Sequence, residues 1–130
     1  RFVRAQDRQY AQALAELKAG RKTSHWIWFV LPQLRGLGRS AMAREYGLAG
    51  RTEAQAYLAH PLLGARLREC VQTMLAHTDR SAVSILGDID ALKFRSCLTL
   101  FDAISEDGLF RQALDAFYGG EPDAATLALL

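Results

Sequence analysis

Apolar residues recur at helical spacing along most of the chain. Tyr10, Leu14 and Leu17 occupy positions i, i+4 and i+7, which places them on one face of a helix over residues 3–19. The same spacing predicts further helices over residues 50–60, 61–78, 88–104 and 107–118, with shorter ones over 41–46 and 81–86 and a last apolar turn over 127–130.

Residues that commonly begin or end helices lie at the ends of these segments. Gly20, Gly87 and Gly119 each follow an apolar pattern, where glycine readily ends a helix. Pro61 separates two helices, because proline is tolerated at a first helical position but not inside a helix. The N-caps expected from side-chain type are Ser24, Ser40, Thr52, Ser81, Asp88 or Asp90, and Asp107.

The apolar run from Trp26 to Leu31 is compatible with a strand or a helix. No second strand is available to pair with it, and an isolated strand leaves its backbone groups unsatisfied, so we expect a short helix. Trp26 and Trp28 are two positions apart and point about 200° apart on a helix, so one of them lies near the surface. The fold class is therefore predicted to be all-α: one compact domain over residues 1–130, a bundle of about six to eight helices.

Composition limits the function classes. Of 130 residues, 50% are hydrophobic and 23% are charged, which is typical of a globular domain. A formal charge of +2 gives no indication of nucleic-acid binding. The apolar run at 26–31 is too short to cross a membrane, and no secretory signal is recognised at the start. Cys70 and Cys97 have no paired spacing, which favours a reduced, cytoplasmic protein.

Candidate chemistry concentrates in residues 21–40, RKTSHWIWFVLPQLRGLGRS, which hold both tryptophans and four of the sixteen Lys and Arg residues. Gly36 and Gly38 precede the helix that Ser40 opens, and a glycine-rich turn before a helix can present backbone N–H groups to an anion. Arg35 and Arg39 flank this turn and can bind phosphate or carboxylate. The alternative is an ordinary tight turn with solvated arginines. The spacing matches neither a P-loop nor a dinucleotide fingerprint.

Two residues are candidates for catalysis. His25 can act as an acid or base near neutral pH, and Gln33 can orient a substrate or water. The alternative for His25 is a capping or hydrogen-bonding role. The other residues predicted to bind ligand are Lys22, Trp26 or Trp28 as a stacking surface, and Lys93, Ser96 and Thr99 on the helix over 88–104. Packing of a face of small residues explains Ser96 and Thr99 equally well. The sequence contains no metal-ligand spacing, and no cofactor is indicated.

Four strings, SHWIWFVLPQLRGLGRS, AYLAHPLLGARL, LKFRSCLTLF and GGEPDAATLALL, make the whole chain resemble a family of uncharacterised bacterial proteins catalogued as a domain of unknown function. Some members carry a calpastatin label that looks like an annotation error. The resemblance implies a mainly helical fold and no particular reaction. Leu31 and Phe94 stand where the family pattern has Phe and Leu. The matching positions are Gly20, Lys22, Ser24, His25, Trp26, Trp28, Phe29, Pro32, Gln33, Gly36, Gly38, Ser40, Tyr46, Tyr57, His60, Pro61, Arg66, Leu67, Lys93, Ser96, Thr99, Leu100 and Phe101.

Two functional hypotheses follow from these residues. The first is a groove for a small anionic ligand, nucleotide-like or ADP-ribose-like, between the segment 22–40 and the helix carrying Lys93 to Thr99. The second is a non-catalytic protein-interaction or structural module that uses the same tryptophan and arginine surface. Whether the protein is an enzyme stays open at this stage. The sequence argues against a membrane partner and against nucleic acid, and it leaves a protein partner open.

Overall fold

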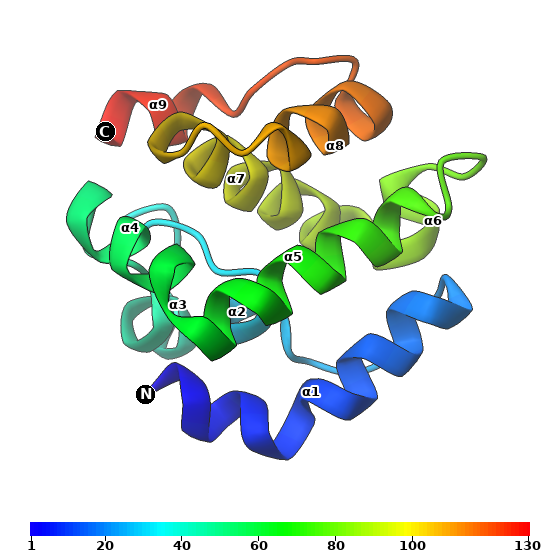
Figure 1. Ribbon diagram of the computed structural model, residues 1–130, viewed down its shortest axis with the longest axis horizontal. Helices are drawn as coiled ribbons and strands as arrows, with labels where there is room; N and C mark the ends of the chain where they lie inside the picture. The colour runs from blue at the N-terminus through cyan, green and yellow to red at the C-terminus, as the bar shows by residue number, and fades with distance from the viewer.

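The computed structural model describes residues 1–130 and contains nine α-helices and no strand (Figure 1). The all-α prediction is confirmed, with one helix more than the six to eight expected. The helices are α1 (Phe2–Ala19), α2 (Ile27–Val30), α3 (Ala41–Tyr46), α4 (Arg51–Ala59), α5 (Pro61–Leu75), α6 (Ala82–Leu86), α7 (Asp88–Ile104), α8 (Gly108–Tyr118) and α9 (Ala124–Leu129).

Most predicted helix ends are confirmed. Gly20 ends α1 in the left-handed conformation, with φ 72°. The side chains of Ser40, Ser81 and Asp107 each accept a hydrogen bond from a backbone N–H of the helix that follows. The last apolar turn is longer than predicted, because Asp123 caps α9 through the backbone N–H of Thr126.

Three predicted caps are wrong. Gly50 is the N-cap of α4, so Thr52 lies inside its first turn. Asp88 and Asp90 both lie in the first turn of α7, where their charges favour the helix dipole without capping it. Ser24 does not cap α2, because its hydroxyl donates to the carboxylate of Glu16.

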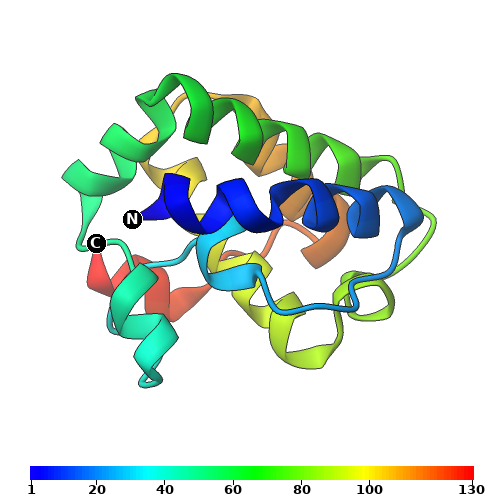
Figure 2. The same ribbon diagram turned by 90° about the horizontal axis from the view of Figure 1, so that it is seen from below.

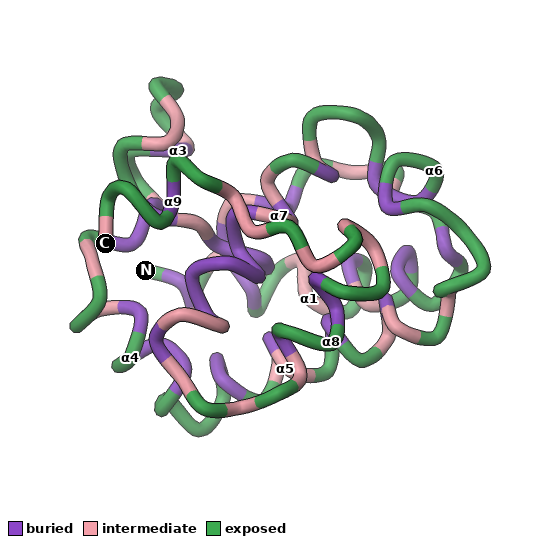
Figure 3. The backbone as a smooth tube through the Cα atoms, turned by 90° about the horizontal axis from the view of Figure 1, so that it is seen from above, coloured by how far each residue is buried: buried purple, intermediate pink, exposed green.

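Helix α7 runs through the middle of the molecule, and its inner side forms much of the core (Figures 1 and 3). It contacts α2, α4, α6, α8 and α9. Phe94, Cys97 and Phe101 on α7 are fully buried in a cluster of 29 apolar residues. Helices α1 and α5 lie side by side against this core (Figure 2).

The two cysteines belong to this core. Cys70 and Cys97 are both free and buried. Burial raises the pKa of the Cys70 thiol to about 12, and it raises that of Cys97 well above its ordinary value. Both therefore stay protonated and unreactive at neutral pH.

None of the nine helices combines the length and apolar character that a membrane span needs.

One buried carboxylate connects α1 to the chain that follows it. Glu16 is 5% exposed and accepts five hydrogen bonds. Its donors are the backbone N–H of Thr23 (2.8 Å), the N–H and hydroxyl of Ser24 (3.0 and 2.5 Å), Trp26 Nε1 (2.9 Å) and Gln12 Nε2 (2.8 Å). Burial acts to raise the pKa of Glu16, but hydrogen bonds from Ser24, Thr23, Gln12 and Trp26 outweigh it and lower the pKa well below its ordinary value.

We predict that Glu16→Gln lowers the free energy of unfolding by about 2–4 kcal/mol, because the neutral amide replaces several charge-assisted hydrogen bonds in a buried site. Urea denaturation at pH 7 measures the change. Glu106→Gln is the matched control, because Glu106 is exposed and its side chain makes no hydrogen bond. A loss at Glu16 no larger than at Glu106 contradicts the structural role assigned to this carboxylate.

The same site predicts a pH dependence. In the unfolded chain Glu16 titrates near its ordinary pKa of about 4.3. Because the native pKa is lower, the unfolded state binds more protons as the pH falls below about 5, and the native state loses stability. The stability difference between the parent chain and Glu16→Gln should therefore shrink from pH 7 to pH 3. Glu53 and Asp107, whose pKa values are also lowered, contribute equally to both proteins. A constant difference across this range would exclude the linkage.

Candidate functional site

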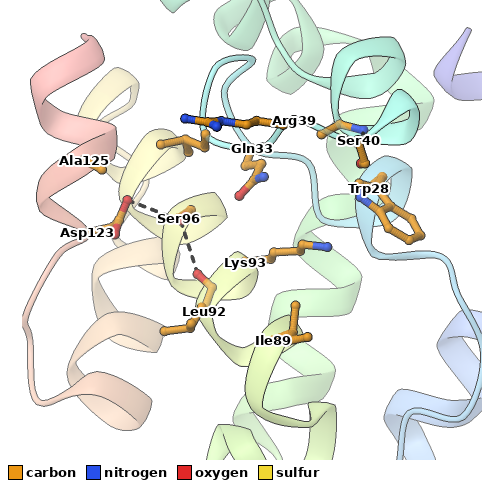
Figure 4. Close-up of a pocket in the computed structure, with 13 residues that line it drawn as sticks. Trp28, Gln33, Arg39, Ser40, Ile89, Leu92, Lys93, Ser96, Asp123 and Ala125 are labelled. Carbon is orange, nitrogen blue, oxygen red and sulfur yellow. Dashed lines mark hydrogen bonds between the residues drawn. The ribbon is translucent and has the colours of Figure 1, made fainter.

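A groove with a volume of about 460 Å³ lies between the segment 28–43 and the first half of α7, with α9 closing one side (Figure 4). We call it the main groove. Seven of its lining residues are site residues predicted from the sequence: Trp28, Gln33, Gly38, Arg39, Ser40, Lys93 and Ser96. The structure thus brings together the two segments that the sequence hypothesis paired.

The wall carrying Gln33 and Arg39 is held by a short backbone pairing. The N–H of Arg35 donates to Leu48 O (2.7 Å), and the N–H of Leu48 donates to Gln33 O (2.9 Å). The chain then turns at Gly36, whose φ of 101° favours glycine. Gly38 has no positive φ, and its role is close approach: a Cβ atom there would lie 2.8 Å from Ala43 Cβ.

The turn before α3 leaves few free backbone N–H groups for the predicted anion cradle. Ser40 caps α3 by accepting from the N–H of Ala43 (3.1 Å), which uses one of the free donors of that helix. Helix α3 has six residues, so its dipole is small. Gly36 lies outside the groove lining. The hydrogen-bond donors that the main groove presents are therefore mainly on side chains.

Three polar side chains on the groove make no hydrogen bond or ion pair within the protein. Arg39 and Lys93 make no ion pair and no hydrogen bond, and neither does the half-buried amide of Gln33. Figure 4 shows the three side chains around the same hollow. Other cations nearby are paired, as Lys22 is with Asp90 (2.6 Å) and Arg95 with Glu121 (3.2 Å). The main groove therefore presents two positive charges without ion-pair partners, together with the carboxylate of Asp123, which accepts hydrogen bonds from neutral donors only.

The opposite end of the groove is fixed by a polar network. Asp123 Oδ2 accepts from the N–H of Thr126 (3.0 Å), its hydroxyl (2.6 Å) and the hydroxyl of Ser96 (3.3 Å). Thr99 is buried beneath this network, where its hydroxyl accepts from the N–H of Asp123 (2.8 Å) and donates to Arg95 O (2.8 Å). These bonds attach α9 to α7, and they leave Thr99 outside the groove lining.

The two tryptophans differ in exposure, as the sequence predicted. Trp26 is fully buried, and its Nε1 donates to Glu16. Trp28 is half-buried and lines the main groove. The Nζ atom of Lys93 lies over the ring of Trp28, 4.4 Å from its centroid. Only Trp28 can therefore offer a ring face to a ligand.

Other predicted site residues lie away from the main groove. His25 is exposed and lines an adjoining hollow of about 510 Å³, which we call the His25 hollow. Trp28 and Lys93 line both hollows, so they lie between His25 and Gln33. The side chain of Lys22 is 5% exposed and committed to Asp90. Arg35 is exposed but outside both linings.

Sequence reasoning missed six lining residues: Leu37, Ala43, Ile89, Leu92, Asp123 and Ala125. Ile89 and Leu92 are 70% and 64% exposed. They left a signal in the sequence, because both fall outside the core stripe of α7 that contains Phe94 and Phe101. Asp123 left none, since its contact with Ser96 spans 27 positions along the chain.

The comparisons with known proteins agree with the resemblance drawn from the sequence. The profile of a family described as "Protein of unknown function (DUF1810)" matches residues 1–130. A crystal structure of the conserved hypothetical protein Rv1873 from Mycobacterium tuberculosis superposes with a TM-score of 0.98 at 48% sequence identity. The match covers 100% of this chain and 94% of that one. No curated protein matches the chain.

We predict that Asp123→Ala loosens α9 and opens one side of the main groove. Losing the cap and the bond to Ser96 should lower the free energy of unfolding by about 1–2 kcal/mol. Amide hydrogen exchange should accelerate more over residues 124–129 than in α5, where it rises only with the global loss of stability. The control is Asp79→Ala, which removes an exposed carboxylate that makes no ion pair. Unchanged exchange in α9 contradicts the assignment of Asp123 as its anchor.

Proposed function

The chain belongs to the DUF1810 family, whose description names no activity, and we propose that it binds a small phosphate-bearing ligand in the main groove. The observation that carries the proposal is the pair of cations without ion-pair partners, Arg39 and Lys93, on a groove that also exposes the free amide of Gln33. These two cations outnumber the single carboxylate of the groove, that of Asp123, so the charge balance favours an anionic ligand. Phosphate suits it because an arginine can hold two oxygens while a lysine contacts a third.

The remaining lining favours a nucleotide-like ligand over a bare anion. The hydroxyl of Ser40 and the amide of Gln33 can donate hydrogen bonds to phosphate oxygens. Trp28, Leu37 and Leu92 supply apolar surface for the rest of the molecule. A volume of about 460 Å³ lies within the usual range for small-molecule sites. An elongated ligand of the ADP-ribose type could also extend toward the His25 hollow.

A catalytic role for His25 is a separate proposal. His25 and Gln33 line different hollows, so they can serve one reaction only on a ligand that extends past Trp28 and Lys93. In that case His25 would exchange a proton with the part of the ligand in its own hollow, while Gln33 orients the phosphate end. The geometry supports binding more directly than catalysis. A cytoplasmic location, favoured by the two free cysteines, is likewise proposed.

A second candidate function is a protein-interaction surface. Ile89 and Leu92 expose most of their apolar side chains on the same groove that Arg39 and Trp28 line. Exposed apolar, aromatic and arginine side chains together are typical of protein interfaces. This candidate function predicts that a protein partner binds the surface with an affinity that does not depend on phosphate.

The ligand proposal predicts that Arg39→Ala weakens phosphate binding by at least about tenfold, because a charge-assisted hydrogen bond is lost. Isothermal titration of inorganic phosphate and of AMP measures the affinities. In a parallel thermal-shift experiment, ligand at 100 times its Kd should stabilise the parent chain by about 2.7 kcal/mol.

Arg44→Ala is the matched control, because Arg44 is an exposed arginine five positions away, outside the groove, and its removal changes the net charge equally. Its phosphate affinity should stay within about twofold of the parent value. Equal losses at Arg39 and Arg44 would indicate non-specific attraction. If neither inorganic phosphate nor AMP binds, the ligand proposal is overturned and the interaction surface is favoured.

A further inference from the structure

We infer that the face of Trp28 covered by Lys93 is the subsite for an aromatic ring of the ligand, and that Lys93 uncovers it by moving onto the ligand's phosphate. The inference rests on the proposed function and narrows it. The ligand class becomes a molecule that carries an anionic group and an aromatic ring together, such as a nucleoside monophosphate.

Lys93 has no competing partner that would keep it in place. Its Nζ lies 4.4 Å from the centroid of the Trp28 ring, and it makes no hydrogen bond or ion pair. Figure 4 shows its side chain extending from α7 toward Trp28. A half-exposed ammonium on a flexible stem is held there only by attraction to the ring.

A second lysine–tryptophan pair in the same molecule shows what a fixed arrangement looks like. Lys22 Nζ lies 4.9 Å from the centroid of the Trp26 ring. It also contacts Asp90 (2.6 Å) and donates to Ser24 O (2.6 Å), and its side chain is 5% exposed. Lys22 and Trp26 are therefore part of the folded framework. Lys93 and Trp28 have neither the extra bonds nor the burial, which leaves them free to rearrange.

Part of the Trp28 ring is not buried by packing within the fold. The other tryptophan, Trp26, is fully buried and donates to Glu16, whereas Trp28 is half-buried and its Nε1 makes no hydrogen bond. It lines both the main groove and the His25 hollow. Aromatic rings stack favourably on such a face, but only after the ammonium leaves it.

A phosphate group supplies the reason for Lys93 to leave. A charge-assisted hydrogen bond to phosphate is a stronger contact for an ammonium than an exposed aromatic ring. A phosphate bound beside Arg39 thus draws Lys93 off Trp28 and prepares the ring subsite. A nucleoside without phosphate has to displace Lys93 and gives it no anion in return. Binding of the phosphate and of the ring is therefore positively coupled, and the coupling is reciprocal.

The test compares four probes on the intact chain: inorganic phosphate, ribose 5-phosphate, adenosine and AMP. The indole N–H signals of the two tryptophans in ¹H–¹⁵N NMR spectra report binding. Trp28 should respond, and the buried Trp26 serves as the internal reference. In the parent chain AMP should bind at least about tenfold tighter than ribose 5-phosphate, and adenosine should bind weakly.

The decisive variant is Lys93→Ala, which should change two affinities in opposite directions. Phosphate binding should weaken by about tenfold, because the variant lacks the ammonium group that contacts the phosphate. Adenosine binding should tighten by about three- to fivefold, because the ring of Trp28 is no longer covered. Lys18→Ala, which removes an exposed lysine at the end of α1, should change neither.

The possible failures are distinguishable. If Lys93→Ala weakens adenosine binding or leaves it unchanged, the covered face is not the ring subsite and this inference is wrong, while Arg39-dependent phosphate binding still supports the proposed function. A second variant, Trp28→Leu, should reduce AMP affinity to that of ribose 5-phosphate. An AMP preference that survives this change also overturns the inference. If the parent chain binds neither phosphate nor AMP, both proposals fall together.

Discussion

The carboxylate of Glu16 is the constraint on which the arrangement of the main groove depends. It collects the backbone N–H groups of Thr23 and Ser24 and the indole N–H of Trp26 at one buried point. These bonds fix where the chain enters α2 and turn Trp26 toward the core. Trp26 is the N-cap of α2, so fixing it inward sets where this helix begins and leaves Trp28, within α2, at the groove. The position of the Trp28 ring in the groove is thus set by Glu16, which does not line the groove.

Helix α7 carries the core and the groove on different faces. Phe94, Cys97 and Phe101 point into the apolar cluster, while Ile89, Lys93 and Ser96 line the hollow. A helix of seventeen residues held by neighbours on several sides is rigid, so the side chains on its outer face have a stable base. The groove-facing side chains of α7 can then move, as inferred for Lys93, without moving the backbone that carries them.

The fold was largely predictable from local signals, since amphipathic spacing and caps depend on residues that are near in sequence. The groove was predictable only in part. Side-chain type identified Gln33, Arg39 and Lys93, but nothing in the local sequence shows that His25 and Gln33 line different hollows. Their separation depends on how α2 packs. Glu16 escaped notice because a glutamate near the end of a surface helix is usually solvated. Its burial is decided by donors seven to ten positions further on.

The distribution of ion pairs favours a ligand site over a chance cluster of basic residues. The chain has a formal charge of only +2, so its cations and anions are nearly balanced overall. Of the acidic residues next to the main groove, Asp90 pairs with Lys22, Asp123 accepts the hydrogen bonds that cap α9, and Asp88 lies in the adjoining His25 hollow. Arg39 and Lys93 make no ion pair and lie beside apolar and aromatic surface. Such a combination is complementary to a molecule that joins an anion to a ring.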